Sequence, residues 1–273
     1  MKTRVKAKPA IISYEKMSRT KSFLYAILGF AVLLVVWQTA VLVFPKFGKM
    51  FPGPVEIVIA VVKALYTPIG KMTLIPHLLV TLSRIFVGYA IGGALGIVIG
   101  LAMGSSKAAH AIINPIFSVL KPIPSIAWIP LAILWFGIGE KSKYFIVGIS
   151  TFIICVLNAT AGAQRTNKNL IGAAKMLGAS DRQLFFKVVL PSAIPQIFAG
   201  LQIALSGACS TILAAEMIRS SEGAGWLIVK GMDTGNMTQI MVGIIAISVT
   251  GMILAIIMRA IERRAIAWNN RGR

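Results

Sequence analysis

The sequence predicts an all-α membrane protein with six transmembrane helices and both termini in the cytoplasm. The prediction rests on composition, on long uncharged runs and on the positions of the basic residues. Of the 273 residues, 57% are hydrophobic and 13% are charged, whereas about a quarter of the residues in soluble domains are charged. Four uncharged runs have about the 20 residues that a helix needs to cross the hydrocarbon core. They are Phe23–Phe44, Ile85–Met103, Tyr144–Ala163 and Ile240–Met258.

Two less regular spans complete the six crossings. Ile123–Ile138 follows Pro122 and Pro124, which interrupt helical hydrogen bonding. Ala193–Met217 carries Glu216 near its far end.

The orientation follows from the basic residues, because short loops that carry them are retained in the cytoplasm. With six crossings, 19 of the 28 Lys and Arg residues fall in segments on one side, and those segments include both chain ends. That side is therefore predicted to be cytoplasmic. Its basic residues are Lys2, Arg4, Lys6, Lys8, Lys16, Arg19, Lys21, Lys107, Lys121, Arg165, Lys168, Lys175, Arg182, Lys187, Arg259, Arg263, Arg264, Arg271 and Arg273.

This topology divides the chain into five parts, with one long cytoplasmic loop at 164–192. The parts are a basic tail (1–22), a first transmembrane helix (23–44), an external loop with a surface helix (45–77), a transmembrane core (78–262) and a second basic tail (263–273).

The net charge of +20 does not indicate a nucleic-acid partner. The charges lie at membrane borders and are not interleaved with aromatic residues, so anionic lipid headgroups of the bilayer explain them better. Cys155 and Cys209 lie inside apolar spans and are interpreted as small core residues. His77 and His110 are isolated in the sequence, so neither a metal site nor a cofactor site is predicted in this chain.

The external segment and the second span each carry a local pattern. FPGP at residues 51–54 places Pro54 at the first position of a helix through Tyr66, which we expect on the outer surface. Small residues at helical spacing allow another helix to approach closely, although the same stripe could line a pore. This stripe consists of Gly88, Gly92, Gly93, Gly96 and Gly100.

Prolines shape the region that follows. Asn114 and Pro115 predict the cap and first turn of a short helix through Leu120. The run KPIPSIAWIP, residues 121–130, breaks regular hydrogen bonding at membrane depth. It is compatible both with a segment that lines a path and with an inert kink.

The cytoplasmic loop contains GAAKMLGASDRQLFFKVVLP, residues 172–191, and predicts a helix, a tight turn and a second helix. Gly178 supplies the left-handed residue that ends the first helix. Ser180 and Gln183 predict a capping box for the second helix, which we expect to stop by Pro191. Such an element can transmit a push into both flanking spans, or it can be a connector without a partner.

The spacing in this loop resembles the EAA loop of binding-protein-dependent ABC importer permeases. Gly172 stands where that family usually has Glu, which removes the acidic partner of any ion pair there. By this resemblance, the residues that couple to the ATPase are Ala173, Ala174, Gly178, Ala179, Ser180, Asp181, Leu190 and Pro191.

Three further stretches are similar to the sulfonate, taurine and nitrate branch of these permeases. They are FPGP, IPLAILWFGIGEKSK (Ile129–Lys143) and AAEMIRSSEGAGWLI (Ala214–Ile228). The resemblance implies a type I (MetI-like) permease fold, a homodimer, ATPase subunits that carry ATP and Mg, and a periplasmic or extracellular binding protein. It also implies a small anion as substrate.

Two other classes of function fit the sequence less well. A membrane enzyme needs convergent acid, base or nucleophile groups, and the spans offer essentially Glu216. An ion-coupled secondary transporter without an ATPase would favour inverted repeats with interrupted helices, and KPIPSIAWIP and LPSAIPQIF hint at these. The cluster GIGEKS, residues 137–142, lacks the ending of a phosphate-binding loop, so ATP is expected on a partner.

Arg84, Trp128 and Glu216 are the candidate pathway or gate residues. Arg84 and Arg219 could attract an anion near the outer mouth or anchor the chain to lipid. Glu216 could close a gate through a charge pair with an arginine, or it could be exposed at the outer surface.

Overall fold

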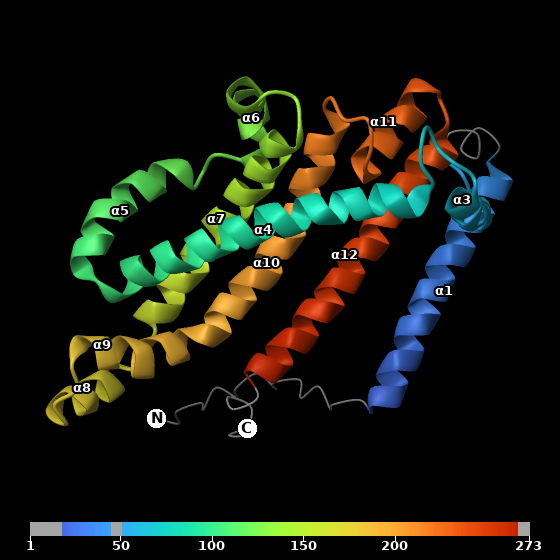
Figure 1. Cartoon of the computed structure of the whole chain (residues 1–273). Coiled ribbons are helices and arrows are strands. Elements are labelled where there is room, and N and C mark those ends of the chain that lie inside the picture. Colours follow the sequence, from blue (N-terminus) through green and yellow to red (C-terminus); the bar gives the residue numbers. More distant parts are fainter. Residues whose placement is uncertain (1–17, 45–50, 267–273) are drawn as a thin grey trace, which may run out of the picture. The chain divides into compact units, whose positions relative to one another are not determined.

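The structure is a computed structural model that describes residues 18–44 and 51–266 (Figure 1). The tail residues predicted at 1–17 and 267–273, and residues 45–50 of the predicted external loop, lie outside the described residues. The chain divides into two compact units, Met1–Val55 and Glu56–Arg273, which are described separately.

In the first unit, helix α1 (Arg19–Val43) corresponds to the predicted first span, Phe23–Phe44. It begins after Ser18, whose Oγ accepts a hydrogen bond from the Lys21 N–H at 3.4 Å. Its side chains are apolar on every face, as is typical of a helix surrounded by lipid.

In the described part of the second unit every regular element is a helix, and one isolated bridge joins Ile69 and Met72. The first two residues of α3, Pro54 and Val55, belong to the first unit. In chain order the helices are α3 (Pro54–Tyr66), α4 (Leu74–Ser105), α5 (Lys107–Leu120), η1 (Ser125–Trp128), α6 (Ile129–Phe136), α7 (Glu140–Gln164), α8 (Lys168–Met176), α9 (Asp181–Leu184), the π-helical turn η2 (Phe185–Val189), α10 (Leu190–Met217), α11 (Ala224–Asp233) and α12 (Met237–Ala265). Pro54 opens α3, as predicted.

Five helices of the described chain are long and apolar enough to cross a membrane, and a bent pair can supply a sixth crossing. That pair joins α5 to η1 and α6 through a bend of 85°. The predicted span Ile123–Ile138 begins within this bend and contains η1 and α6, and it reaches the length of a sixth crossing only together with α5. Pro122 and Pro124 explain the bend, because neither has an N–H to continue the helical hydrogen bonds.

Helix α7 lies at the centre of the unit and packs against both α4 and α10. Figure 1 shows α4 crossing these two helices. Two buried clusters fill the contact. One surrounds Val147 and Ala208, and the other surrounds Ala159 and Ala193. The three helices thus form the core that positions the remaining segments.

The glycine stripe of α4 is the surface that packs on α7, so the packing interpretation is confirmed. A Cβ added at Gly96 would lie 2.7 Å from the Cβ of Cys155, and one at Gly100 would lie 2.7 Å from the Cβ of Ala159. Real Cβ atoms do not approach so closely, so only glycine permits this separation of the two helices. Gly93 differs, because an added Cβ would meet Leu201 at an ordinary 3.5 Å.

One local prediction was wrong, and one helix was not predicted. Asn114 and Pro115 do not start a helix, because Ser106 caps α5 eight residues earlier and Pro115 lies inside it. Ser106 Oγ accepts a hydrogen bond from the Ala109 N–H, which supplies the cap. Helix α11 was not predicted at all, since its ten residues are too few for a span.

Replacement of Gly96 by alanine is expected to destabilise the chain by about 1–3 kcal/mol, because the new methyl group overpacks the contact with α7. Gly93→Ala is the matched control, since it adds the same methyl group three residues away without a clash. Thermal unfolding in detergent measures both variants. Equal melting temperatures for the two would contradict the close packing.

Candidate functional site

The loop between α7 and α10 forms the helix, turn and helix that the sequence predicts. Helix α8 ends in a hydrogen-bonded turn in which Ala179 N–H donates to Ala174 O and Gly178 N–H donates to Lys175 O, each at 3.0 Å. Gly178 has φ +79°, a left-handed conformation that glycine adopts without strain. These bonds satisfy carbonyl groups that a helix end otherwise leaves free.

The second helix starts with the predicted capping box. Ser180 Oγ accepts from the Gln183 N–H at 3.4 Å, and Gln183 Oε1 accepts from the Ser180 N–H at 3.0 Å. The capping box fixes the direction in which the chain leaves the turn.

This second helix does not stop by Pro191, and that prediction was wrong. It continues through η2 into α10, and Asp181–Met217 forms one span of 37 residues. The wide turn lets the Leu190 N–H donate to Phe185 O, five residues back. Pro191 then lies in the first turn of α10, where its missing N–H interrupts little. The loop is therefore continuous with a membrane helix.

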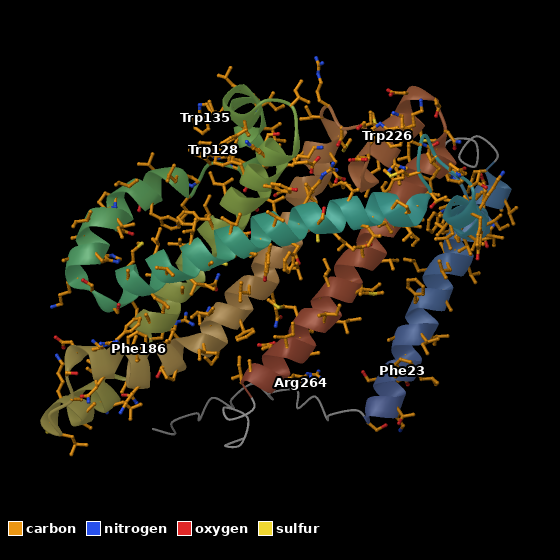
Figure 2. The ribbon with its side chains drawn as sticks, in the orientation of Figure 1. Phe23, Trp128, Trp135, Phe186, Trp226 and Arg264 are labelled. Atoms are coloured by element: carbon orange, nitrogen blue, oxygen red, sulfur yellow. The ribbon has the colours of Figure 1, made fainter. Side chains whose placement is uncertain are left out.

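Large apolar side chains cover the tip of the loop. Met176 is 86% exposed and Leu177 is 88% exposed, beside Gly178. Leu170 and Phe186 are also exposed, and Figure 2 labels Phe186 on the adjoining turn. Apolar patches on a polar loop indicate a surface that a partner covers.

The other predicted loop residues lie along the same element. Ala173, Ser180 and Asp181 are exposed, whereas Ala174, Ala179, Leu190 and Pro191 are half-buried. A Cβ added at Gly172 would meet no atom within 4 Å, so the position has room for a side chain.

A buried charge cluster lies near the other ends of α7 and α10. Arg84 of α4 is fully buried. Its Nε donates to Glu140 Oε2 at 2.7 Å and its Nη2 donates to Glu140 Oε1 at 2.6 Å, a two-point contact with the first residue of α7. Its Nη1 donates to Glu216 Oε1, near the end of α10, at 2.8 Å. One guanidinium therefore joins three helices.

The cluster also fixes the segment between α10 and α11. Arg84 Nη1 donates to the backbone carbonyl of Glu222 at 3.0 Å. The Gly225 N–H donates to Glu216 Oε2 at 3.0 Å, and the Ala224 N–H donates to Thr81 Oγ at 2.9 Å. These side chains satisfy the first N–H groups of α11, which a helix start leaves without partners.

His77 completes this arrangement. Its Nδ1 accepts from the Gly223 N–H at 3.1 Å, and its Nε2 lies 3.1 Å from Ile69 O. Nδ1 as the acceptor fixes the neutral ring with its proton on Nε2. The ring also stacks on Trp226 of α11, which Figure 2 labels, at a centroid distance of 5.2 Å.

The structure brings two of the three gate candidates together and corrects their surroundings. Arg84 is not a lipid anchor, and Glu216 is not exposed, because each is at most 1% exposed and they pair with one another. Trp128 lies on η1, and its ring meets that of Phe145 edge-on, with the ring centroids 6.5 Å apart. Arg219 is exposed and has φ +57°.

Four residues of this cluster were not predicted from the sequence: His77, Thr81, Glu140 and Glu222. A signal for the first two was present, since His77, Thr81 and Arg84 recur at the spacing of one helix face. It was overlooked because the second span was predicted to begin at Ile85, whereas α4 begins at Leu74.

The chemistry of the cluster is that of fixed charges. Every polar contact of Arg84 is with a carboxylate or a carbonyl oxygen. In residues 18–44 and 51–266, no three His, Cys, Asp or Glu side chains are grouped closely enough to hold a metal ion. Cys155 is buried and Cys209 is half-buried, and both are free thiols.

The chain is similar to known transport proteins over most of its length. Residues 92–267 match the family described as binding-protein-dependent transport system inner membrane component. The taurine transport system permease protein TauC of Escherichia coli (strain K12) is 34% identical over 88% of this chain and 87% of its own. The nitrate import permease protein NrtB of Synechocystis sp. (strain ATCC 27184 / PCC 6803 / Kazusa) is 31% identical over 82% of each chain.

The fold is also similar to that of a solved transporter. A chain in an inward-facing structure of the MetNI methionine ABC transporter superposes with a TM-score of 0.56 at 19% identity. The match covers 70% of this chain and 93% of that chain.

Arg84→Met is expected to lower the free energy of unfolding by about 3–5 kcal/mol, because it leaves Glu216 buried without its charge partner. The double variant Arg84→Met/Glu216→Gln is expected to recover part of this loss, since it removes the unpaired charge. The stability of both variants is measured by unfolding in detergent, with the yield of monodisperse protein as the readout.

Arg219→Met is the control, because Arg219 forms no ion pair with a described residue. It is expected to be close to neutral. If the double variant were no more stable than Arg84→Met, the buried ion pair would not be the interaction that was lost.

Proposed function

This chain belongs to the family of binding-protein-dependent transport system inner membrane components, and we propose that two copies of it form the path of an ATP-driven importer. It is a multi-pass permease of the inner membrane. In the proposal, ATP and Mg bind to separate ATPase subunits, and a periplasmic or extracellular binding protein delivers the substrate.

The exposed apolar tip of the loop is the observation that carries the ATPase proposal. Met176 and Leu177 are almost fully exposed on a capped, rigid element that continues into α10. A groove of an ATPase would bury these side chains, and each is of a size that stabilises a contact by about 1.5–3 kcal/mol. The loop and both termini then lie in the cytoplasm, as the basic residues predict.

The geometry suggests how a push at the loop reaches the outside. Helix α7 enters the loop and α10 leaves it, while Arg84 joins the distant ends of both through Glu140 and Glu216. A helix of 25 residues such as α7 is about 37 Å long. We propose that the two helices rock together as ATPase subunits close, with Arg84 as the external clamp of the gate.

Each state of this cycle is favoured only by its differential binding of nucleotide and of the loaded binding protein. The clamp needs no change of its own during the cycle. Arg84 is therefore assigned to the walls of the external gate rather than to substrate binding, and Trp128 is kept as a candidate for the path.

A small organic or inorganic oxyanion is the proposed substrate class. The relatives named for taurine and nitrate transport support it. Both ligands carry an oxyanion, and a homodimer would present each contact of the path twice around it.

Purification in mild detergent is expected to recover this chain with an ATPase subunit in equal amounts. Leu177→Ser should weaken the association by roughly tenfold, because it removes the apolar contact at the tip. Densitometry of the copurified subunits measures the change. Val58→Ser is the control, since Val58 is 62% exposed on α3, away from the loop.

An unchanged ATPase content in Leu177→Ser would contradict the proposed docking surface. Uptake by the purified chain without any ATPase would contradict the importer and favour an ion-coupled transporter.

Gly178→Val is expected to uncouple ATP hydrolysis from uptake or to abolish assembly. A β-branched residue in this left-handed conformation costs about 1–3 kcal/mol and distorts the turn. Gly172→Ala is the matched control, because an added Cβ meets open space in α8. Uptake and hydrolysis in proteoliposomes test the pair. Wild-type coupling in Gly178→Val would make the proposed role of the turn wrong.

A further inference from the structure

A cavity of about 640 Å³ lies where the end of α4 and the start of α5 meet the end of α7 and helix α8. It is separate from the Arg84 cluster and from the exposed tip at Met176 and Leu177, and Asp181 is the one predicted coupling residue that lines it. Its polar lining includes Lys107, His110, Thr166, Lys168, Lys175 and Asp181.

The cavity is electropositive. Lys107, Lys168 and Lys175 line it against the single carboxylate of Asp181. None of the three lysines forms an ion pair within the described part of the chain. Helices α5 and α8 both begin at the cavity, at Lys107 and Lys168, and the positive ends of their dipoles add to the lysine charges.

Two buried polar atoms of the lining have no partner. Thr166 is 5% exposed, and its Oγ has no hydrogen-bond partner among the described residues. The same holds for Nδ1 of His110 on α5. A buried hydroxyl without a partner costs about 1–3 kcal/mol, so the cavity gains from a ligand with oxygen acceptors.

The two sides of α8 are divided between the cavity and the exposed apolar tip. Lys168, Ile171 and Lys175 recur at the spacing of one helix face and line the cavity. Leu170 and Leu177 lie on the opposite face and are exposed. A partner at the tip therefore leaves the lysine face available.

We propose that this cavity binds a phosphate group, either free phosphate or the phosphate of an anionic lipid headgroup. A phosphate oxyanion presents several strong acceptors in a tetrahedral arrangement, which suits donors that converge from α5, α8 and the α7–α8 connection. A phosphate bound there connects the loop to α5 through charge-assisted hydrogen bonds. The cavity is close to the predicted cytoplasmic border, where anionic headgroups gather.

The test uses the full chain without an ATPase, so its outcome does not depend on the proposed function. In one arm, radiolabelled inorganic phosphate is titrated into detergent-purified chain at constant ionic strength. In the other, the chain is placed in nanodiscs of phosphatidylglycerol or of phosphatidylcholine, and native mass spectrometry counts the retained lipids. One phosphate per chain in the first arm, or one retained phosphatidylglycerol in the second, identifies the source.

Thr166→Val removes the hydroxyl at constant shape, and Lys168→Gln removes one charge from the exposed rim. Each is expected to weaken the binding by about tenfold. Lys187→Gln is the control, because Lys187 belongs to the same loop but does not line the cavity. The proposal is overturned if neither arm shows binding, or if Lys187→Gln weakens it as much as the two cavity variants.

Discussion

The rest of the architecture depends on one interaction, the pairing of the Arg84 guanidinium with Glu140 and Glu216. The guanidinium is fully buried, and it pairs with carboxylates at the start of α7 and near the end of α10. A buried charge is tolerated only when it is paired and hydrogen-bonded. The segment between α10 and α11 contributes the Glu222 carbonyl to Arg84, and the Gly225 N–H at the start of α11 donates to Glu216, so the charges of this pair are hydrogen-bonded as well as paired.

This clamp determines how the loop at the opposite ends of α7 and α10 acts on the two helices. A glycine turn, a capping box and a continuous helix make the loop rigid, and the glycine stripe of α4 holds α7 close. Force applied at Leu177 therefore acts on two helices that cannot separate at their far ends. In the proposed importer, ATPase closure tilts the pair as one body instead of bending either helix.

Sequence reasoning was strongest where a local signal decides the structure. The turn at Gly178, the Ser180 capping box and the glycine stripe each follow from backbone sterics that a few neighbouring residues determine. It failed where partners are distant in the chain, because Arg84 and Glu140 are 56 residues apart and no local pattern joins them. The prediction that the second loop helix stops by Pro191 also failed, because a π-helical turn, in which the Leu190 N–H donates to Phe185 O, carries the helix past the proline.

In the proposed cycle, α7 and α10 remain joined at the Arg84 end while the loop end moves. Spin labels at the exposed positions Lys141 and Arg219 report this end directly, after the two native cysteines are replaced. Doubly labelled chain is diluted into an excess of unlabelled chain, so that a proposed dimer carries one labelled copy. Electron paramagnetic resonance of this sample, without the ATPase and in the ATP-bound complex, is predicted to give one narrow distance distribution with the same mean. A second population, or a mean that shifts when ATP binds, would contradict the clamp.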